Sequence, residues 1–292
     1  MKNAIGPLIY VAAMAAVLGL CAAGDRGGSM ALVYPAVYLL ALGLNVLMTY
    51  CWPTEDHRET WSDYRESLII AFIALAANQI LFGPWSGYMP NALAQSFYAD
   101  GYINFVRNLP VVITLPIAVI AFEGLGYLIH RWVHRGGFIW ERVHSAHHEP
   151  KSFGAALTIR ISYGDYFFHT LVRGSLVGLL QFDPHVLATA MVLSVLGGAL
   201  CHANTSLKFG WASKIFVTPD FHIWHHDPYR RVNYSFGLFS VFDRWGGTFY
   251  LPGDRPRVLG IQNVESARSG WESILMRPLR YASRKAGSQE TR

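Results

Sequence analysis

The stretch Glu123-Gly-Leu-Gly-Tyr127-Leu-Ile-His130-Arg-Trp-Val-His134 joins an apolar segment to a pair of histidines. If it is helical, His130 and His134 are one turn apart on one face, and Glu123 lies two turns before His130 on that face. A carboxylate inside an apolar span is costly. We therefore expect the sequence to provide Glu123 with a partner.

Two further histidine clusters follow this stretch and share one spacing. His144-Ser-Ala-His147-His148 and His222-Ile-Trp-His225-His226 are both His-x-x-His-His triplets. Residues three and four apart are neighbours on a helical surface. Two identical triplets beside a His-x-x-x-His pair are poorly explained by chance, so we interpret the three clusters as a metal site.

Single histidines need separate interpretation. His202 ends an apolar stretch and is a ninth candidate ligand, with an interfacial hydrogen-bonding histidine as the alternative. His169 and His185 stand alone, and for them we prefer that alternative. Metal-bound imidazoles donate their other N–H to a carboxylate or carbonyl group. Glu123 is therefore interpreted as such a partner, with a polar contact between packed helices as the alternative.

The number of imidazoles points to more than one metal ion. Eight or nine exceed the four ligands of one zinc site, so they imply two ions. A dizinc hydrolase would hold its ions with bridging carboxylates, and none has that spacing. A ferritin-like diiron site needs two Glu-x-x-His motifs, and only residues 141–144 have that form. Iron bound by neutral imidazoles suits dioxygen chemistry beside an apolar substrate, so oxidation of a lipid is the leading hypothesis.

Composition indicates a lipid environment. The chain has 292 residues, of which 52% are hydrophobic and 15% charged, whereas an average soluble domain has about 25% charged residues. The values exclude disordered, collagen-like and coiled-coil classes. Three scattered cysteines form neither a disulfide framework nor a Cys-x-x-Cys site. The net charge of +5 is spread between apolar runs and over residues 277–292, which is typical of membrane flanks and not of a nucleic-acid-binding stripe.

Hydropathy predicts an all-α integral membrane bundle. Four spans are expected at residues 6–23, 30–52, 67–83 and 109–129, since about 20 apolar residues cross a bilayer. Residues 171–182 and 185–201 are expected to form a short helical hairpin. We divide the chain into transmembrane helices (1–129), a histidine-rich catalytic region that includes membrane hairpin 171–201 and a helical cap (130–255), and a basic tail (256–292).

Basic residues predict the orientation. Lys2 precedes the first span, Arg58 and Arg65 follow the second, and residues 84–108 contain only Arg107. By the positive-inside rule, the N-terminus and everything after the fourth span face the cytoplasm. The histidine cap is thus expected on the cytosolic side of a bacterial inner membrane or the endoplasmic reticulum. A cleaved or lipidated signal near Cys21 is the alternative for the first span.

Residues 123–252 resemble the membrane fatty acid hydroxylase and sterol desaturase superfamily. Residues 123–134 are similar to its Asp-x-x-x-Tyr-x-x-His-Arg-x-x-His signature, and Thr218-Pro219 precedes the third histidine cluster as in the family. Asn233-Tyr234 and residues 242–248 are similar to its Asn-Tyr-Gly and Trp-Asp-Arg-x-Phe-Gly-Thr signatures. The chain departs from the family pattern at Glu123, at Ser162 and Asp165, where many members have His and Glu, and at Phe242 and Gly246.

The resemblance implies an all-helical membrane enzyme with a cytosolic diiron centre that hydroxylates or desaturates a lipid with dioxygen and two external electrons. Its ligands and catalytic residues would be His130, His134, His144, His147, His148, His222, His225 and His226, with His202 joining the ligands. Supporting roles are expected for Glu123, Asn204, Asn233 and Asp243. Arg160 and Arg173 are candidates for holding a substrate headgroup, with anchoring to lipid phosphate as the alternative.

Electrons must come from another protein. The sequence has no Gly-x-Gly-x-x-Gly nucleotide motif and no cysteine set for an iron–sulfur cluster. A ferredoxin or a b-type cytochrome with its reductase is therefore expected. A membrane metallohydrolase or a zinc-bound lipid-binding protein is the alternative function. A transporter is disfavoured because the histidines lie at span ends and not near the midplane. Sterols, fatty acyl chains, sphingolipids, ornithine lipids, carotenoids and alkyl ethers all remain open as substrates.

Overall fold

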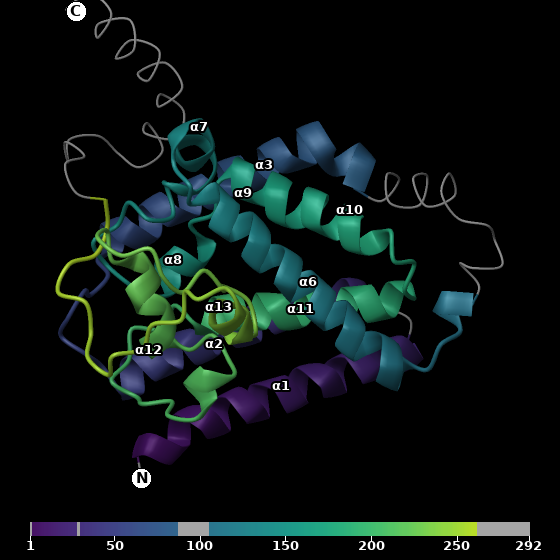
Figure 1. Ribbon diagram of the computed structural model, residues 1–292, viewed down its shortest axis with the longest axis horizontal. Coiled ribbons are helices and arrows are strands. Elements are labelled where there is room, and N and C mark those ends of the chain that lie inside the picture. Colours follow the sequence, from purple (N-terminus) through teal and green to yellow (C-terminus); the bar gives the residue numbers. More distant parts are fainter. Residues whose placement is uncertain (1, 28–29, 87–104, 262–292) are drawn as a thin grey trace, which may run out of the picture.

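Long helices dominate the chain (Figure 1). The computed structural model describes residues 2–27, 30–86 and 105–261, and no strand occurs among them. The first helices are α1 (Lys2–Gly27), α2 (Met30–Cys51) and α3 (Trp61–Ser86). After them come α6 (Val111–Val133) and α11 (Pro184–Leu200), which are the other long helices of the described residues. The expected helical fold class is confirmed.

Three helices are long and apolar enough to cross a membrane. They are residues Ala4–Ala23 of α1, Leu32–Cys51 of α2 and Val111–Val133, the whole of α6. The expected third span, residues 67–83, is helical within α3 but is not among these three. The count of four spans therefore stays a prediction. Large apolar side chains such as Leu8, Leu39 and Val112 are exposed on the three candidate spans, as expected for surfaces that lipid covers.

Helix α11 lies at the centre of the bundle, in contact with α1, α2 and α6. It starts where the side chain of Asp183 accepts a hydrogen bond from the backbone N–H of His185, with Pro184 in the first turn. Its small residues permit close packing. A Cβ atom on Gly197 would lie 2.2 Å from the carbonyl oxygen of Gly237, so the 236–239 segment rests directly on this helix.

The first arm of the expected hairpin begins earlier than predicted. It is not a single short helix over residues 171–182. Residues 163–178 form α9 (Tyr163–Tyr166), the π-helical turn η2 (Phe167–Val172) and α10 (Arg173–Gly178) in direct succession. Ser162 and Asp165 form a reciprocal capping box at the start of α9, which fixes where this segment begins.

The residues after α11 form irregular loops with short helical turns, η3 (Ala212–Lys214), α12 (Pro219–His222), η4 (Ile223–His226) and α13 (Val241–Trp245). Helix α6 runs through residue 129 without a break, so His130 belongs to the same helix as the apolar segment before it. The three-part division of the chain stays a prediction, and most of the expected basic tail, residues 262–292, lies outside the described residues.

Candidate metal centre

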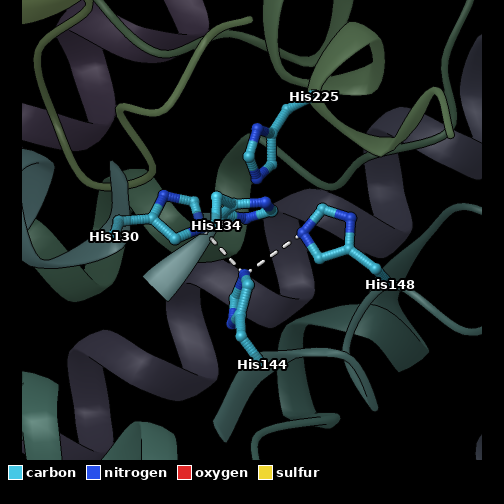
Figure 2. Close-up of side chains that lie close together, drawn as sticks. All are labelled: His130, His134, His144, His148 and His225. Atoms are coloured by element: carbon cyan, nitrogen blue, oxygen red, sulfur yellow. Dashed lines mark hydrogen bonds between the residues drawn. The ribbon is translucent and has the colours of Figure 1, made fainter. Parts of the chain in front are cut away.

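The nine histidines expected as ligands converge in two adjacent groups. We call the first the five-histidine group (His130, His134, His144, His148 and His225) and the second the four-histidine group (His147, His202, His222 and His226). Within each group the candidate ligand nitrogens all lie within 4.8 Å of one another. Figure 2 shows the five rings of the first group turned toward a common centre. His134 is half-buried, and the other eight are buried.

Each His-x-x-His-His triplet contributes to both groups. The first triplet begins at the last residue of the π-helical turn η1 (Trp140–His144), which follows α7 (Gly137–Ile139). Its His144 and His148 belong to the five-histidine group and its His147 belongs to the other. In the second triplet, at α12 and η4, the adjacent His225 and His226 are likewise divided. Neighbouring residues thus point to different groups, whereas the residues four apart in each triplet stay together.

Backbone carbonyls fix the orientation of four of these rings. The Nδ1 atom of His130 donates to the carbonyl of Tyr234, and those of His147, His202 and His225 donate to Arg160, Gly198 and Val232 at 3.2, 2.7 and 3.0 Å. A carbonyl oxygen only accepts, so the proton sits on Nδ1 and the Nε2 lone pair is free. This is the arrangement that metal-binding imidazoles require.

The Nε2 atoms face one another at short distances. His130 and His144 approach to 2.8 Å, His144 and His148 to 3.1 Å, and His147 and His202 to 3.2 Å. Where both nitrogens present lone pairs, a cation between them removes the repulsion. The Nε2 atoms of His225 and His226 are buried and have no hydrogen-bond partner among the described residues. These orphaned acceptors fit bound metal ions.

Burial favours the neutral form of five imidazoles in the two groups, those of residues 134, 148, 202, 225 and 226. It lowers the pKa of His225 from 6.5 to about 3 and that of His202 to about 4, although in both a backbone carbonyl hydrogen bond opposes the shift. Burial, followed by repulsion from neighbouring histidines, also lowers the pKa of His134, His148 and His226 well below 6.5. A neutral imidazole is the form that binds a metal.

Asp165 supports the fifth ring and was not predicted in this role. Its Oδ1 accepts from Nδ1 of His144 at 2.7 Å, and its Oδ2 accepts from the hydroxyl of Ser162 at 3.1 Å. The Ser-x-x-Asp spacing at residues 162–165 was the available signal, because it is typical of a capping box that fixes a carboxylate. The sequence interpretation noted these two residues only as departures from the family pattern.

Glu123 has a different partner from the expected imidazole. Its carboxylate accepts from the backbone N–H groups of Leu238 at 2.5 Å and Phe239 at 3.4 Å. The structure therefore agrees with the alternative interpretation, a polar contact in packing. A Cβ on Gly237 would lie 2.4 Å from the carboxylate, so the glycine lets this segment approach α6.

The hydrogen bonds of the Asn204 side chain go to groups other than the imidazoles. Its Nδ2 donates to the carbonyls of Asp56 at 2.8 Å and His57 at 3.2 Å, while its Oδ1 accepts from Arg255 at 2.6 Å. It fastens the loop between α2 and α3 to the segment after α11. These contacts do not orient any of the nine histidines, which was the role expected for Asn204.

Asn233 and Asp243 act through the backbone. Asp243 accepts from the backbone N–H groups of Tyr234 at 2.7 Å and Ser235 at 2.8 Å. Asn233 donates to the carbonyls of Phe221 at 2.7 Å and Tyr250 at 2.8 Å. The segment that they hold supplies the carbonyls of residues 232 and 234, which accept from His225 and His130.

Arg160 is unsuited to the headgroup contact expected of it. The residue is buried, and its guanidinium donates to the carbonyl of Ala146 at 2.8 Å and to Glu149 at 3.1 Å. Glu66 lies 3.5 Å away. Two carboxylates already compensate this charge, so the guanidinium serves the cap internally and is not offered to a ligand.

A cavity of about 190 Å³ borders both histidine groups. Histidines of both groups line it, and its other walls come mainly from apolar and aromatic side chains of α2, α6 and α11. His169 also lines it, with its ring centroid 6.1 Å from that of His130. His169 thus lies beside the five-histidine group, which its isolated place in the sequence did not indicate, and its interpretation as an interfacial histidine stays a prediction. His185 is exposed, apart from both groups.

Part of the chain matches a known protein family. Residues 115–248 match the model of the family described as "Fatty acid hydroxylase". A similar protein is "Very-long-chain aldehyde decarbonylase GL1-9" from Oryza sativa subsp. japonica, 22% identical over 234 residues that cover 73% of this chain and 84% of that protein. "Sphinganine C4-monooxygenase 2" from Arabidopsis thaliana is 28% identical over 147 residues, covering 47% of this chain and 53% of that protein. No solved structure matches.

Proposed function

Since residues 115–248 of the chain fit the fatty acid hydroxylase and sterol desaturase superfamily, which implies oxidation of lipids, we propose that it is a membrane-bound diiron oxygenase. Its substrate is a lipid or lipid-like molecule that is hydroxylated or desaturated. The reaction uses dioxygen and two external electrons. The similarity to a protein named as a monooxygenase supports hydroxylation as the first reaction to test.

One observation carries the proposal: nine imidazoles divide into a group of five and a group of four that border one apolar cavity. Each group has enough nitrogens for one ion, with His130, His134, His144, His148 and His225 around one and His147, His202, His222 and His226 around the other. Imidazole is a suitable ligand for iron. Nearly all-histidine ligation adds no negative charge, so the ions keep their capacity to accept electrons.

When bound, iron would activate dioxygen, so that one oxygen atom enters a C–H bond and the other leaves as water with two electrons and two protons. The protein supplies position and dryness. Carbonyl and carboxylate acceptors hold the rings in a fixed orientation, which limits the rearrangement needed for reaction. The apolar cavity walls hold a methylene group beside the ions and exclude water.

The electron donor is proposed to be a separate protein, a ferredoxin or a b-type cytochrome with its reductase. The sequence carries no nucleotide-binding motif and no cysteine set for an iron–sulfur cluster. We further propose that the histidine cap faces the cytosol of a bacterial inner membrane or the endoplasmic reticulum. The basic residues at 58, 65, 131 and 135 support that orientation.

Metal content and lipid composition together test the proposal. Full-length protein handled without oxygen should contain about two iron ions per chain, one for each group. Lipids of cells with and without the gene should differ by the mass of one added oxygen or two lost hydrogens. The double variant His147→Ala and His225→Ala should abolish that difference, with His185→Ala as an exposed control.

The alternative function predicts a different metal content and no consumption of dioxygen. A metallohydrolase or a zinc-bound lipid-binding protein would retain zinc that does not exchange for iron, and it would consume no dioxygen in the presence of lipid and reductant. That combination would overturn the oxygenase proposal. Purified iron-loaded protein that turns over with NADPH and no added donor would overturn the proposed separate donor alone.

A further inference from the structure

Arg173, at the start of α10, is the charged residue of the cavity whose hydrogen-bonding capacity is least used. It is only 6% exposed, and it lines the same cavity as His130 and His144. Among the described residues its guanidinium reaches one acceptor, the hydroxyl oxygen of Ser194, at 3.2 Å. The Nε atom is buried without a partner. A guanidinium has five donors, so most of them are left for another molecule.

The guanidinium is held in a fixed place despite its few hydrogen bonds. Its Cζ atom lies 3.6 Å from the ring centroid of Phe122 and 5.4 Å from that of Phe236. On its third side it rests against α6, where a Cβ on Gly126 would lie 2.4 Å from Nη1. Two aromatic rings and a glycine thus form a slot for a planar cation.

No described carboxylate neutralises this cation directly. Glu123 acts on Arg173 through space, and no ion pair joins the two side chains in the described part of the chain. Its Oε2 accepts from the backbone N–H groups of Leu238 and Phe239, and its Oε1 is buried with no hydrogen-bond partner among the described residues. Asp165 also lines the cavity, and it is engaged by His144 and Ser162. Arg160 provides the contrast within the same chain, since two carboxylates surround it. A buried cation without a bonded counter-charge is costly unless a ligand supplies one.

We propose that Arg173 is the binding site for an oxyanion, a carboxylate or a phosphate, carried by an otherwise apolar substrate. The inference rests on the proposed function, because it assigns the substrate class of the same cavity. The planar guanidinium matches two oxygens of such a group. Ser194 shares the site, and the aromatic walls accept the hydrocarbon part of the molecule.

The site lies next to the candidate metal centre. The ring of Phe236 contacts the guanidinium on one side, and its centroid lies 4.9 Å from that of His130 on the other. One aromatic ring therefore separates the oxyanion site from the five-histidine group. Tyr34, Tyr38 and Tyr166 also line the cavity, and their rings offer apolar surface to a hydrocarbon chain.

Binding can be tested without any oxidation chemistry. Full-length protein loaded with Zn²⁺, which has no redox chemistry, is mixed with octadecanoate, octadecyl phosphate or octadecan-1-ol, and the dissociation constants are measured by native mass spectrometry. Because a charge-assisted hydrogen bond contributes 1.5–3 kcal/mol, at least one oxyanion should bind about 10- to 100-fold more tightly than the alcohol. Whether octadecanoate or octadecyl phosphate binds better identifies the headgroup.

Three variants separate the role of Arg173 from folding. Arg173→Gln should bring the oxyanions and the alcohol to equal affinity. Gly126→Ala, which displaces the guanidinium but keeps its charge, should weaken oxyanion binding and leave the alcohol unchanged. Arg107→Gln is the matched control, because Arg107 is exposed and donates to the amide of Gln181 at 3.0 Å, outside the residues that line the cavity. It should keep the full preference.

A wild-type protein that binds the alcohol as tightly as both oxyanions would overturn this inference. So would an oxyanion preference that survives in both Arg173→Gln and Gly126→Ala. The iron-loaded protein, supplied with reductant and dioxygen, tests the oxygenase proposal independently. Absence of an oxidised product there, with oxyanion binding intact, would refute the oxygenase and leave the binding site standing.

Discussion

Asp165 and His144 form a buried pair in which Oδ1 of the carboxylate lies 2.7 Å from Nδ1 of the imidazole. The opposite nitrogen of His144 faces both His130 and His148. Asp165 thus orients the ring that lies between two other members of the five-histidine group.

Replacing Asp165 by Asn should weaken metal binding at this group. The amide keeps the shape but removes the negative charge that accepts the Nδ1 hydrogen bond of His144, and loss of such a partner costs about 10- to 100-fold in metal affinity. Competition with a chromophoric chelator measures the change. Asp183→Asn, at the start of α11, is the matched control, because its side chain accepts from the backbone N–H of His185, which lies outside both histidine groups. Equal affinities in the two variants would contradict the assignment.

The adjacent residues His225 and His226 should affect different ions. Because His225 belongs to the five-histidine group and His226 to the four-histidine group, each alanine variant should weaken one site. His226→Ala leaves three nitrogens and His225→Ala leaves four, so the first should lose more metal during dialysis against a chelator. Metal analysis gives the number of ions per chain. Loss of both ions in both variants would mean that the two groups do not act separately.

The metal-free protein should lose stability as the pH falls. Burial lowers the pKa of His225 to about 3 and that of His202 to about 4 in the folded protein, whereas an unburied histidine has a pKa of 6.5. The unfolded chain therefore binds more protons below pH 6.5, and the stability present above that pH declines as acid is added. Each pH unit below 6.5 costs up to about 1.4 kcal/mol for each such histidine.

Thermal unfolding between pH 8 and pH 5 measures this effect. We expect a constant Tm above pH 7 and a falling Tm below pH 6.5, with a higher Tm throughout for metal-loaded protein. A Tm that rises on acidification would show that the histidines gain protons in the folded state, contrary to their burial.

Gly197→Ala should destabilise the protein without touching a histidine. The added Cβ would lie 2.2 Å from the carbonyl oxygen of Gly237, so α11 and the 236–239 segment must separate, at a cost of about 1–3 kcal/mol. Gly43→Ala in α2 is the control, since its Cβ would meet nothing within 4 Å. Chemical unfolding of both variants compares them, and equal stabilities would contradict the close approach.

Sequence patterns predicted the elements that depend on local periodicity. Apolar runs gave the long helices, and the spacing of His130 and His134 gave their shared face. The triplets were predicted to be metal ligands, which stays a prediction, but their division between two groups was not predicted. In each triplet the two residues four apart lie in one group and the remaining histidine lies in the other. That division depends on how α12 and η4 pack against η1 and its following turn.

Long-range partners could not be read from local patterns. Arg160 and Arg173 look alike in the sequence, as basic residues near apolar stretches, yet one lies between Glu66 and Glu149 and the other faces a cavity. His169 had no nearby histidine along the chain and meets His130 only in the fold. Glu123 was expected to accept a hydrogen bond from an imidazole because it shares a helix face with His130. It accepts instead from the backbone N–H of Leu238, in a loop more than 100 residues later in the chain.

The four carbonyls that accept from His130, His147, His202 and His225 belong to the main chain. Every amino acid supplies such a carbonyl, so mutation at residues 160, 198, 232 and 234 cannot delete the acceptor as long as the backbone keeps its course. The orientation of these proposed ligands is therefore insensitive to much of the side-chain variation that accumulates around them during evolution. Asp165 lacks that protection, since only a side chain supplies its oxygen, and selection must act on it directly.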